Sequence, residues 1–406
     1  MNFDDNSLYN IKSSVDGKRY SLFELATWKN GLAFKKINFC ETGVPVIKIA
    51  ELNNGIGGTT AYTQQTFSED VHLCKGDLLF SWSGNPQTSI DIFRFNLDEG
   101  WLNQHIFKVT PDEKAVDRDY FYFLMKNLKP HFTQIATNKQ TTGLGHVTIA
   151  DIKRMSVVIP SLDVQRKIVS YIKPIDDKIE LNNEINDNLE QQAQSYFQEL
   201  FVDNADPEWT TGTISDLGTV VGGSTPSKAK PEYYTESGIA WITPKDLSNN
   251  KSKFVSHGEN DITELGLRNS SASIMPEGTV LFSSRAPIGY IAIAAGEVTT
   301  NQGFKSVVPK PEIGTPFVYF FLKNTLPVIE GMASGSTFKE VSGSTMKNVP
   351  AVIPDAETLA KFSDFCAPIF AQQRILEEQN QSLATLRDNL LPKLMSGEID
   401  VSAVQL

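Results

Sequence analysis

Two loops of this 406-residue sequence carry groups that could bind phosphate. The stretch 222–230 (GGSTPSKAK) concentrates glycines, hydroxyl side chains and two lysines. Backbone N–H groups, hydroxyls and ammonium groups at this density suit contacts with phosphate oxygens, although an ordinary solvated loop has the same composition. The stretch 29–36 (KNGLAFKK) stands at the equivalent place in the first half of the chain and keeps a glycine and basic residues. Both loops are therefore candidates for anion binding.

A second pair of stretches carries groups that can hydrogen-bond the edges of bases. Residues 283–289 (SSRAPIG) are followed by 301–303 (NQG), and residues 81–87 (SWSGNPQ) by 103–105 (NQH). Arginine can bind guanine, and asparagine or glutamine can bind adenine, through two hydrogen bonds each. Asn103 and Asn301 are equally typical of amides that cap a turn, in which case their variable neighbours would read the bases.

A third pair leads into the last strand expected in each half, 138–146 (NKQTTGLGH) opposite 334–339 (SGSTFK). Single lysines elsewhere add further phosphate ligands. The three pairs together predict the following candidates for contacts with nucleic acid: Lys35, Lys36, Lys48, Ser83, Asn85, Gln87, Lys139, Gln140, Thr141, His146, Ser224, Thr225, Ser227, Lys228, Lys245, Ser284, Arg285 and Lys339.

No set of catalytic residues accompanies these loops. The sequence has no G-x-x-x-x-G-K-[ST] phosphate loop, no G-x-G-x-x-G after a strand, and five scattered histidines without metal-ligand spacing. The stretch 85–87 (NPQ) lacks the second proline and the aromatic residue of the Asn-Pro-Pro-aromatic motif of amino-methyltransferases, so a loop turn is the better interpretation. We therefore expect a chain that is not an enzyme and that itself binds no cofactor and no metal.

The composition is typical of a soluble protein of several domains, with 40% hydrophobic and 21% charged residues. No run approaches the roughly 18 consecutive apolar residues that a membrane span needs. The acidic, polar beginning of the sequence does not look like a secretory signal, and three cysteines far apart in sequence form no CxxC pair. These features predict a cytoplasmic location without membrane association.

The chain contains a long internal repeat. Residues 155–161 (MSVVIPS) match 349–355 (VPAVIPD), residues 76–81 (GDLLFS) match 278–283 (GTVLFS), and residues 121–127 (FYFLMKN) match 318–324 (VYFFLKN). The separation drifts between 194 and 202 residues, as small loop insertions would produce. Matches that recur in the same order indicate a tandem duplication.

Each half begins with about 150 residues of short β-like runs, punctuated by Gly, Pro and Asn. One helix is expected inside each of these mixed α/β parts, over 119–128 in the first half and 316–326 in the second. A helical segment follows each part, with apolar residues every three or four positions. We expect Pro174 and Pro368 each to restart a helix after a short lead-in helix, and Gly397 to end the second helix.

The apolar stripes of the two helical segments extend over about 27 residues, or roughly 40 Å at 1.5 Å per residue. Packing on the adjacent globular part alone would not need this length. We therefore predict that the two helices pair with each other, antiparallel, with Asn182 and Asn186 at core-like positions.

The formal net charge of −11 is concentrated in the helical segments, because residues 163–202 and 355–406 each carry −4 while residues 1–162 are neutral. A protein that binds nucleic acid alone is usually basic. If the chain contacts DNA, a partner is expected to supply much of the phosphate neutralisation, and the acidic helices suit docking of that partner.

Together these features resemble the specificity subunit of type I restriction–modification systems, over essentially the whole chain. The resemblance rests on the duplicated endings at 145–172 (GHVTIADIKRMSVVIPSLDVQRKIVSYI) and 338–362 (FKEVSGSTMKNVPAVIPDAETLAKF). The opening of the second half at 213–247, the block GTVLFSSRAPIG at 278–289 and the tail LRDNLLPKLMSGEID at 386–400 support it.

The resemblance implies an α+β fold built as a tandem duplication of two mixed α/β target recognition domains, at 1–160 and 203–354. A conserved spacer helix region would follow each domain, at 161–202 and at 355–406 with the tail, and the two helices would pair as an antiparallel coiled coil. The first domain departs most from the family pattern, which leaves its base-contacting residues open.

The resemblance also implies a function without catalysis. Each recognition domain would read one half of a bipartite, asymmetric site in double-stranded DNA, and the helices would set the spacing and dock two modification (methyltransferase) subunits. Restriction (translocase/endonuclease) subunits would complete the complex, and S-adenosylmethionine, ATP and Mg would be bound by those partners. The alternative hypothesis is an orphan or silent, specificity-like scaffold protein without DNA-directed activity.

Overall fold

In the computed structural model, contacts divide the chain into two compact units. Unit 1 consists of residues 1–178 and 383–406, and unit 2 consists of residues 179–382. The structure describes residues 9, 16–140, 143–285, 287–335 and 339–401. The division assigns parts of each long helix to both units, whereas the sequence suggested that the helical regions were segments of their own.

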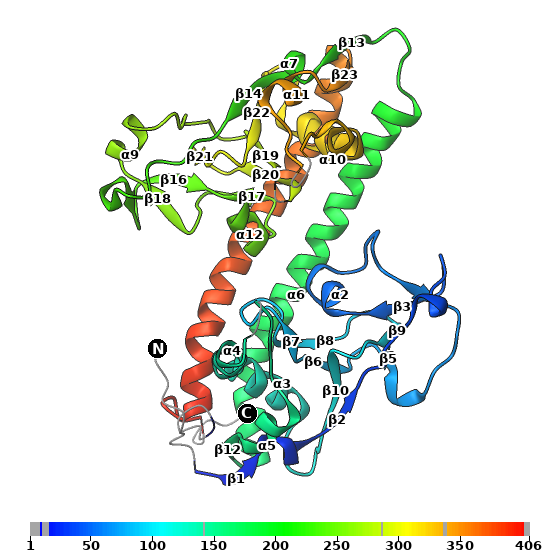
Figure 1. Ribbon diagram of the computed structural model, residues 1–406, viewed down its shortest axis with the longest axis vertical. Helices are drawn as coiled ribbons and strands as arrows, with labels where there is room; N and C mark the ends of the chain where they lie inside the picture. The colour runs from blue at the N-terminus through cyan, green and yellow to red at the C-terminus, as the bar shows by residue number, and fades with distance from the viewer. Residues whose placement is uncertain (1–8, 10–15, 141–142, 286, 336–338, 402–406) are drawn as a thin grey trace. The chain divides into compact units, whose positions relative to one another are not determined.

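Unit 1 is a mixed α/β structure (Figure 1). Its strands are β1 (Lys18–Ser21), β2 (Ala26–Asn30), β3 (Val44–Ile47), β4 (Tyr62–Thr63), β5 (His72–Cys74), β6 (Leu78–Ser81), β7 (Ser83–Gly84), β8 (Asp91–Arg94), β9 (Glu99–Leu102), β10 (Ile106–Pro111), β11 (Gly145–His146) and β12 (Ser156–Ile159). Its helices are α2 (Ile49–Asn54), α3 (Arg118–Asn127), α4 (Lys129–Asn138), α5 (Ile149–Arg154), the first part of α6 (Leu162–Gln198) and the last part of α12 (Ala356–Ser396).

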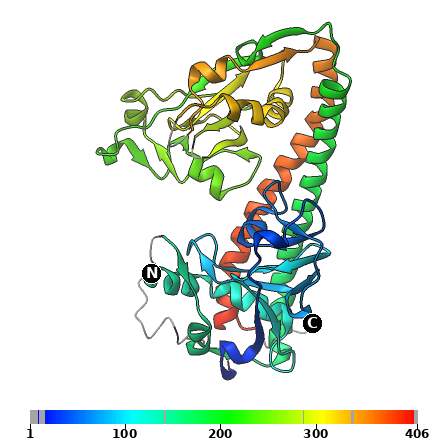
Figure 2. The same cartoon turned by 45° about the vertical axis from the view of Figure 1, so that its right-hand side comes forward.

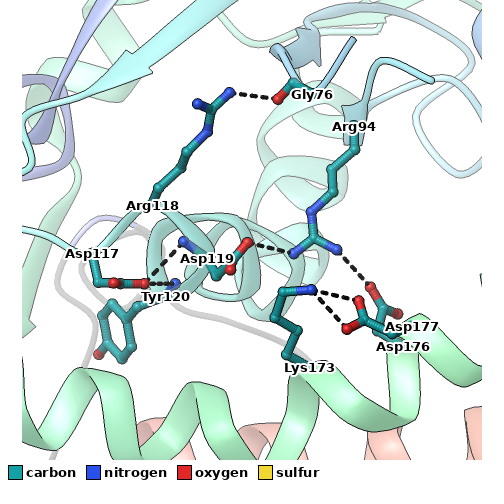
Figure 3. Close-up of polar contacts among 9 residues, drawn as sticks. All are labelled: Gly76, Arg94, Asp117, Arg118, Asp119, Tyr120, Lys173, Asp176 and Asp177. Carbon is teal, nitrogen blue, oxygen red and sulfur yellow. Dashed lines mark hydrogen bonds and ion pairs between the residues drawn. The ribbon is translucent and has the colours of Figure 1, made fainter. Parts of the chain in front are cut away.

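The strands of unit 1 form one antiparallel sheet in the order β2-β10-β6-β8 and a second sheet in the order β4-β3-β9-β5, in which β3 and β9 are parallel. Strand β6 is buried along its whole length, which its apolar sequence explains. Helix α3 is capped by the preceding Asp117, whose carboxylate accepts the backbone N–H groups of Asp119 and Tyr120 (Figure 3).

Unit 2 repeats this plan. Its strands are β13 (Thr210–Thr213), β14 (Gly218–Gly222), β15 (Tyr234–Thr235), β16 (Ile239–Ile242), β17 (Phe254–Val255), β18 (Asn260–Ile262), β19 (Val280–Ser284), β20 (Ile288–Ala294), β21 (Thr299–Thr300), β22 (Lys305–Pro309) and β23 (Pro350–Ile353). Its helices are α7 (Ile214–Leu217), α8 (Pro244–Asn249), α9 (Glu264–Arg268), α10 (Thr315–Met332), α11 (Gly343–Lys347) and the first part of α12 (Ala356–Ser396), joined by the rest of α6.

The sheets of unit 2 correspond to those of unit 1. The order β14-β22-β19-β20 matches β2-β10-β6-β8, with β17 added at the edge, and the parallel pair β16-β21 matches β3-β9. The predicted α+β class and the tandem duplication are confirmed. The helices expected over 119–128 and 316–326 are α3 and α10, although α10 continues to Met332.

The predicted restart of each long helix at a proline is wrong. Helices α6 and α12 are continuous over 37 and 41 residues, through Pro174 and Pro368. An interior proline removes a backbone hydrogen bond and costs about 3 kcal/mol. Here the neighbouring apolar side chains are buried, among them Ile172 in α6 and Ile369 in α12, and their packing offsets this cost. Gly397, with φ of +76°, ends α12 as predicted.

The predicted antiparallel pairing of α6 and α12 is confirmed within unit 2. The Asn182 side chain donates to Asn380 Oδ1 at 2.8 Å, and Gln373 Nε2 donates to the Asn186 carbonyl at 3.1 Å. The partner of Asn186 therefore has a lower residue number on α12 than the partner of Asn182, so the two helices run in opposite directions. Their segments in unit 2 lie side by side in both views (Figures 1 and 2). Asn182 is fully buried, as its core-like position predicts.

In unit 1 an arginine of the sheet helps to join the globular part to the long helices. Arg94 of β8 donates to Asp119 of α3 at 2.9 Å and to Asp176 of α6 at 3.4 Å (Figure 3). Its guanidinium carbon lies 4.0 Å from the centroid of the Tyr122 ring, and Asp176 also accepts from Arg387 of α12 at 2.9 Å. This network connects a strand and three helices.

A lysine has the corresponding role in unit 2. Lys253 Nζ lies 2.7 Å from Glu190 Oε2 of α6, 2.9 Å from Gln373 Oε1 of α12 and 3.6 Å from the centroid of the Phe370 ring. Glu190 also accepts from Lys323 of α10 at 2.5 Å. Burial opposes ionisation of Glu190, but the two ammonium groups lower its pKa to about 2. Burial lowers the pKa of Lys253 to about 8, because the attraction of one carboxylate does not offset it.

Candidate nucleic-acid interface

The two glycine-containing loops occupy equivalent positions in the two units. After β2, the backbone N–H of Leu32 donates to the Leu102 carbonyl at 2.8 Å. After β14, the backbone N–H of Ser224 donates to the Thr300 carbonyl at 2.9 Å. Each loop is therefore hydrogen-bonded to the residue that precedes the Asn-Gln pair of its own unit. The sequence suggested that the two loops are equivalent, and these hydrogen bonds show it.

A glycine permits this close approach in both loops. A Cβ added to Gly31 would lie 2.0 Å from the Asn103 carbonyl oxygen, and one added to Gly223 would lie 1.9 Å from the Asn301 carbonyl oxygen. Any side chain at either position would collide with backbone atoms. The glycines thus fix the path of both loops over the Asn-Gln pairs.

The asparagine of the second pair caps a turn. Asn301 Oδ1 accepts the backbone N–H of Gly303 at 2.8 Å, and its carbonyl accepts that of Phe304 at 3.2 Å. The Asn103 carbonyl accepts the N–H of Ile106 at the same distance, 3.2 Å. Of the two interpretations of Asn301, this geometry favours the capping amide, which leaves base contacts to its neighbours.

In unit 2 the structure brings four predicted residues together. Thr225, Lys228, Lys245 and Arg285 line one hollow of about 490 Å³. They come from the loop after β14, from the start of α8 and from the end of β19. Other residues of its wall are Trp241, Asp246, Glu259 and the 301–303 turn.

The charges around this hollow nearly balance. Lys228, Lys245 and Arg285 face two carboxylates, Asp246 and Glu259, and Lys245 Nζ lies 2.6 Å from Glu259 Oε2. That hydrogen bond raises the pKa of Lys245. The hollow therefore presents donors and acceptors together, as base edges require, but little net positive charge for phosphates.

Glu340 borders the same region and was missed by the sequence analysis. It faces Arg285 on an isolated β-bridge, with Arg285 Nη1 3.7 Å from Glu340 Oε2, and Lys305 Nζ lies 3.9 Å from its other oxygen. Burial lowers the pKa of Lys305, against the attraction of Glu340. The duplication contained a signal, since Glu340 stands 194 residues after the predicted residue His146.

In unit 1 the structure brings Ser83 and His146 together, because they are cross-strand partners on β7 and β11. Next to Ser83, the indole N–H of Trp82 donates to Asn30 Oδ1 at 3.1 Å. The Trp82 ring lies 5.5 Å from that of His105, between ring centroids. These contacts connect the 29–36 loop with the two predicted residues.

Further candidates have exposed side chains and stay predictions: Lys35, Lys36, Gln140, Ser227 and Lys339. Their exposure is compatible with contacts to phosphate. Thr141 lies outside the described residues.

Lys139 has a structural partner. Its ammonium lies 2.5 and 2.6 Å from the two carboxylate oxygens of Asp151, which is 1% exposed. Burial opposes ionisation of this carboxyl, but hydrogen bonds from Lys139 and Thr148 lower its pKa. Lys139 therefore compensates a buried charge, a role that does not require DNA.

Three other candidates of unit 1 have contacts of their own outside the Ser83–His146 pair. Asn85 Oδ1 accepts the backbone N–H of Gln87 at 2.9 Å and so caps a turn. Gln87 lines a different hollow, of about 820 Å³, beside α3 and α4. The Lys48 ammonium lies 5.1 Å from the centroid of the Phe39 ring.

Ser284 must be withdrawn as a contact residue. It is fully buried, and its hydroxyl donates to the Gly303 carbonyl at 3.1 Å, so it presents no polar atom to a ligand. The backbone of Ser224 holds Trp241, which lines the hollow: the Ser224 carbonyl accepts the indole N–H of Trp241 at 3.0 Å.

Over the described ranges, no three His, Cys, Asp or Glu side chains come together as a metal site would require. In the same part of the chain, no helix combines the length and the apolar character needed to cross a membrane. All three cysteines are unpaired thiols, with Cys366 buried and Cys40 and Cys74 exposed.

Comparison with known proteins gives a consistent result. Residues 15–191 and 207–386 each match the family Methylase_S, described as the type I restriction modification DNA specificity domain. The two matches cover most of the chain and coincide with the two halves of the duplication.

Individual relatives agree with the family match. The type I restriction enzyme MjaIX specificity subunit of Methanocaldococcus jannaschii is 39% identical over 194 residues, which are 46% of this chain and 45% of that protein. The HindI specificity subunit of Haemophilus influenzae is 25% identical over 403 residues, 80% of this chain and 87% of that protein. The crystal structure of a type I restriction-modification S subunit from M. genitalium has the same fold, with a TM-score of 0.52 and 16% identity over 95% of this chain and 97% of that one.

Proposed function

Because this chain belongs to the type I restriction modification DNA specificity family, we propose that it selects the DNA sequence on which a type I restriction–modification complex acts. Each globular part reads one half of a bipartite, asymmetric site in double-stranded DNA. The chain itself has no catalytic role, and the alternative is an orphan or silent scaffold of the same fold.

One observation carries this proposal. The loop and the Asn-Gln turn have the same backbone hydrogen bonds in both units, while the side chains around them differ. A repeated frame with different side chains can present two different sets of donors and acceptors within one chain. Two unlike half-sites on one DNA duplex call for such a pair of surfaces.

The chemistry of the complex is assigned to partner subunits. Two modification subunits would bind S-adenosylmethionine and methylate adenine after flipping it out of the duplex, and restriction subunits would use ATP and Mg. The acidic segments 163–202 and 355–406 suit docking of proteins better than contact with phosphate. The helices α6 and α12 would fix the number of base pairs between the half-sites.

The test is the adenine methylome of the source strain, measured by single-molecule sequencing with and without this gene. Loss of methylation at one split motif on gene deletion is expected, and restoration by the gene on a plasmid is the control. A methylome that does not change would favour the orphan or silent alternative.

A further inference from the structure

One cross-strand pair stands at the same place in both units but differs in its side chains. In unit 1, Ser83 of β7 is opposite His146 of β11. In unit 2, Arg285 is opposite Glu340 on an antiparallel β-bridge. The first residue of each pair, Ser83 or Arg285, lies on the segment that leaves a central strand of the antiparallel sheet, after β6 or β19.

Hydrogen bonds on one side of the pair confirm that the two places are equivalent. In unit 1 the backbone N–H of Val147 donates to the Trp82 carbonyl at 2.8 Å. In unit 2 the N–H of Val341 donates to the Ser284 carbonyl at 2.9 Å. In each unit the acceptor stands just before Ser83 or Arg285, and the donor stands just after His146 or Glu340.

Hydrogen bonds to the Asn-Gln turn complete the equivalence. The N–H of Trp82 donates to the His105 carbonyl at 3.3 Å, and the N–H of Ser284 donates to the Gly303 carbonyl at 2.7 Å. The same backbone frame therefore connects the pair, the turn and the glycine-containing loop in both units.

The side chains that this frame presents have different chemistry. Arg285 and Glu340 are 37% and 42% exposed, and their closest charged atoms are 3.7 Å apart, a separation that leaves hydrogen-bonding capacity on both groups. Unit 1 places a hydroxyl and an imidazole there, both partly exposed. Lys305 of β22, whose ammonium lies 3.9 Å from Glu340, is opposite Gly222, and the equivalent position of unit 1, opposite Asn30, is Phe107 of β10.

We propose that these two cross-strand pairs, Arg285–Glu340 in unit 2 and Ser83–His146 in unit 1, are specificity-determining positions that make the two half-sites different. The inference rests on the proposed function and adds to it the residues that distinguish one half-site from the other. It includes Glu340, which contacts Arg285 and supplies an acceptor of its own.

The chemistry of the unit 2 pair selects a G·C base pair. Arginine donates two hydrogen bonds to guanine O6 and N7, and a glutamate carboxylate accepts from the cytosine N4 amino group in the same groove. An A·T pair has an amino donor where the guanidinium needs an acceptor. The half-site read by unit 2 is thus expected to contain a G·C pair that depends on both residues.

The experiment uses the full chain in complex with its modification subunits and a library of DNA duplexes with a randomised central segment. The sequences bound by the wild-type complex define the split motif. In the double variant Arg285→Ser/Glu340→His, which copies the unit 1 pair, preference for the G·C pair should fall roughly 5- to 150-fold at one position. The other half of the motif is an internal control for folding and assembly.

A matched control exchanges the same residue types elsewhere in unit 2. Arg268 and Glu264 form an exposed pair within α9, with charged atoms 3.9 Å apart. The variant Arg268→Ser/Glu264→His should keep the complete motif. The variant Arg285→Lys retains the positive charge but not the two-pronged geometry, so it should bind DNA with a guanine preference reduced at least roughly fivefold.

The outcomes separate the two levels of the proposal. A wild-type complex that selects no split motif would overturn the proposed function itself. A wild-type motif that the Arg285→Lys variant and the double variant both retain unchanged would overturn the specificity role of the pair alone. If the double variant binds no DNA, the Arg285→Lys variant tests the inference by itself. A reduced guanine preference supports the specificity role of the pair, and an undiminished preference overturns it.

Discussion

The buried carboxylate of Glu190 allows a quantitative test of how unit 2 is held together. It accepts from Lys253 at 2.7 Å and from Lys323 at 2.5 Å, and so joins α6 to the globular part. The substitution Glu190→Gln keeps the size and one acceptor oxygen but removes the negative charge. Lys323 would then lose its carboxylate partner, and the nearly buried Lys253, whose pKa burial already lowers to about 8, would lose the group that favours its ammonium form.

The magnitude follows from the pKa of Glu190. A fall from 4.5 to about 2 means that folding favours the ionised form by about 3 kcal/mol at neutral pH. The side chain is 22% exposed, so solvent screening reduces this value little. Removal of one partner from a buried ion pair costs about 3–5 kcal/mol. We therefore expect Glu190→Gln to lower the free energy of unfolding by about 3 kcal/mol at pH 7.

The sign of the pH dependence is fixed by the same shift. Because the folded-state pKa lies below the unfolded-state value, the stabilisation is complete above pH 4.5 and is lost as the pH falls through about 2. The difference between wild type and variant should therefore shrink to about 1 kcal/mol at pH 3.

Urea unfolding of both proteins at the two pH values measures this difference, and hydrogen exchange of α10 peptides assigns it to unit 2. The control is Glu184→Gln, an exposed glutamate on the same helix, whose substitution should change the free energy of unfolding by less than about 0.5 kcal/mol. A loss below about 1 kcal/mol for Glu190→Gln at pH 7, or a difference that grows on acidification, would refute the argument.

Three further predictions concern the loop, the helix pair and the spacing. Gly223→Ala should lower the stability of unit 2 by about 1–3 kcal/mol and weaken only the half-site that unit 2 reads, because the new Cβ would lie 1.9 Å from a carbonyl oxygen. The control in thermal unfolding and DNA binding is Gly222→Ala, whose Cβ would make only an ordinary van der Waals contact with Lys305 Cδ at 3.9 Å. Asn182→Leu should raise the free energy of unfolding by up to about 1 kcal/mol in urea, because removal of the buried Oδ1 without a hydrogen-bond partner outweighs loss of the bond from Nδ2 to Asn380; a less stable variant would contradict this. Deleting four residues from each of α6 and α12, roughly 6 Å of helix, should change the spacer in the methylated motif, and an unchanged spacer would exclude the helices as its determinant.

Much of the architecture could be predicted from local patterns and from the repeat. Apolar runs such as 280–283 are strands because their side chains are buried on both faces, and three- and four-residue spacing produced two long helices. Gly397 ended a helix where a positive φ was needed. These features depend on residues close in sequence, so a sequence reports them directly.

The candidate site was predictable only in part. Thr225, Lys228, Lys245 and Arg285 were identified from residue type and line one hollow. Ser284, adjacent to Arg285, was included for the same reason but is fully buried. Residue type does not distinguish these two neighbours, because β19 is buried along its whole length as far as Ser284, whereas Arg285 follows the end of the strand, and the fold sets these surroundings.

Taken alone, the sequence determined the duplication, the fold class, the antiparallel helix pair and the two loops, since repeats and periodicity are properties of the chain itself. Only the tertiary structure decided that the helices continue through Pro174 and Pro368, that Lys139 compensates a buried carboxylate, and that Glu340 faces Arg285. Each of these depends on groups far apart in sequence that strand register and packing bring within a few ångströms. The energies of such contacts, not local preference, then set the role of each residue.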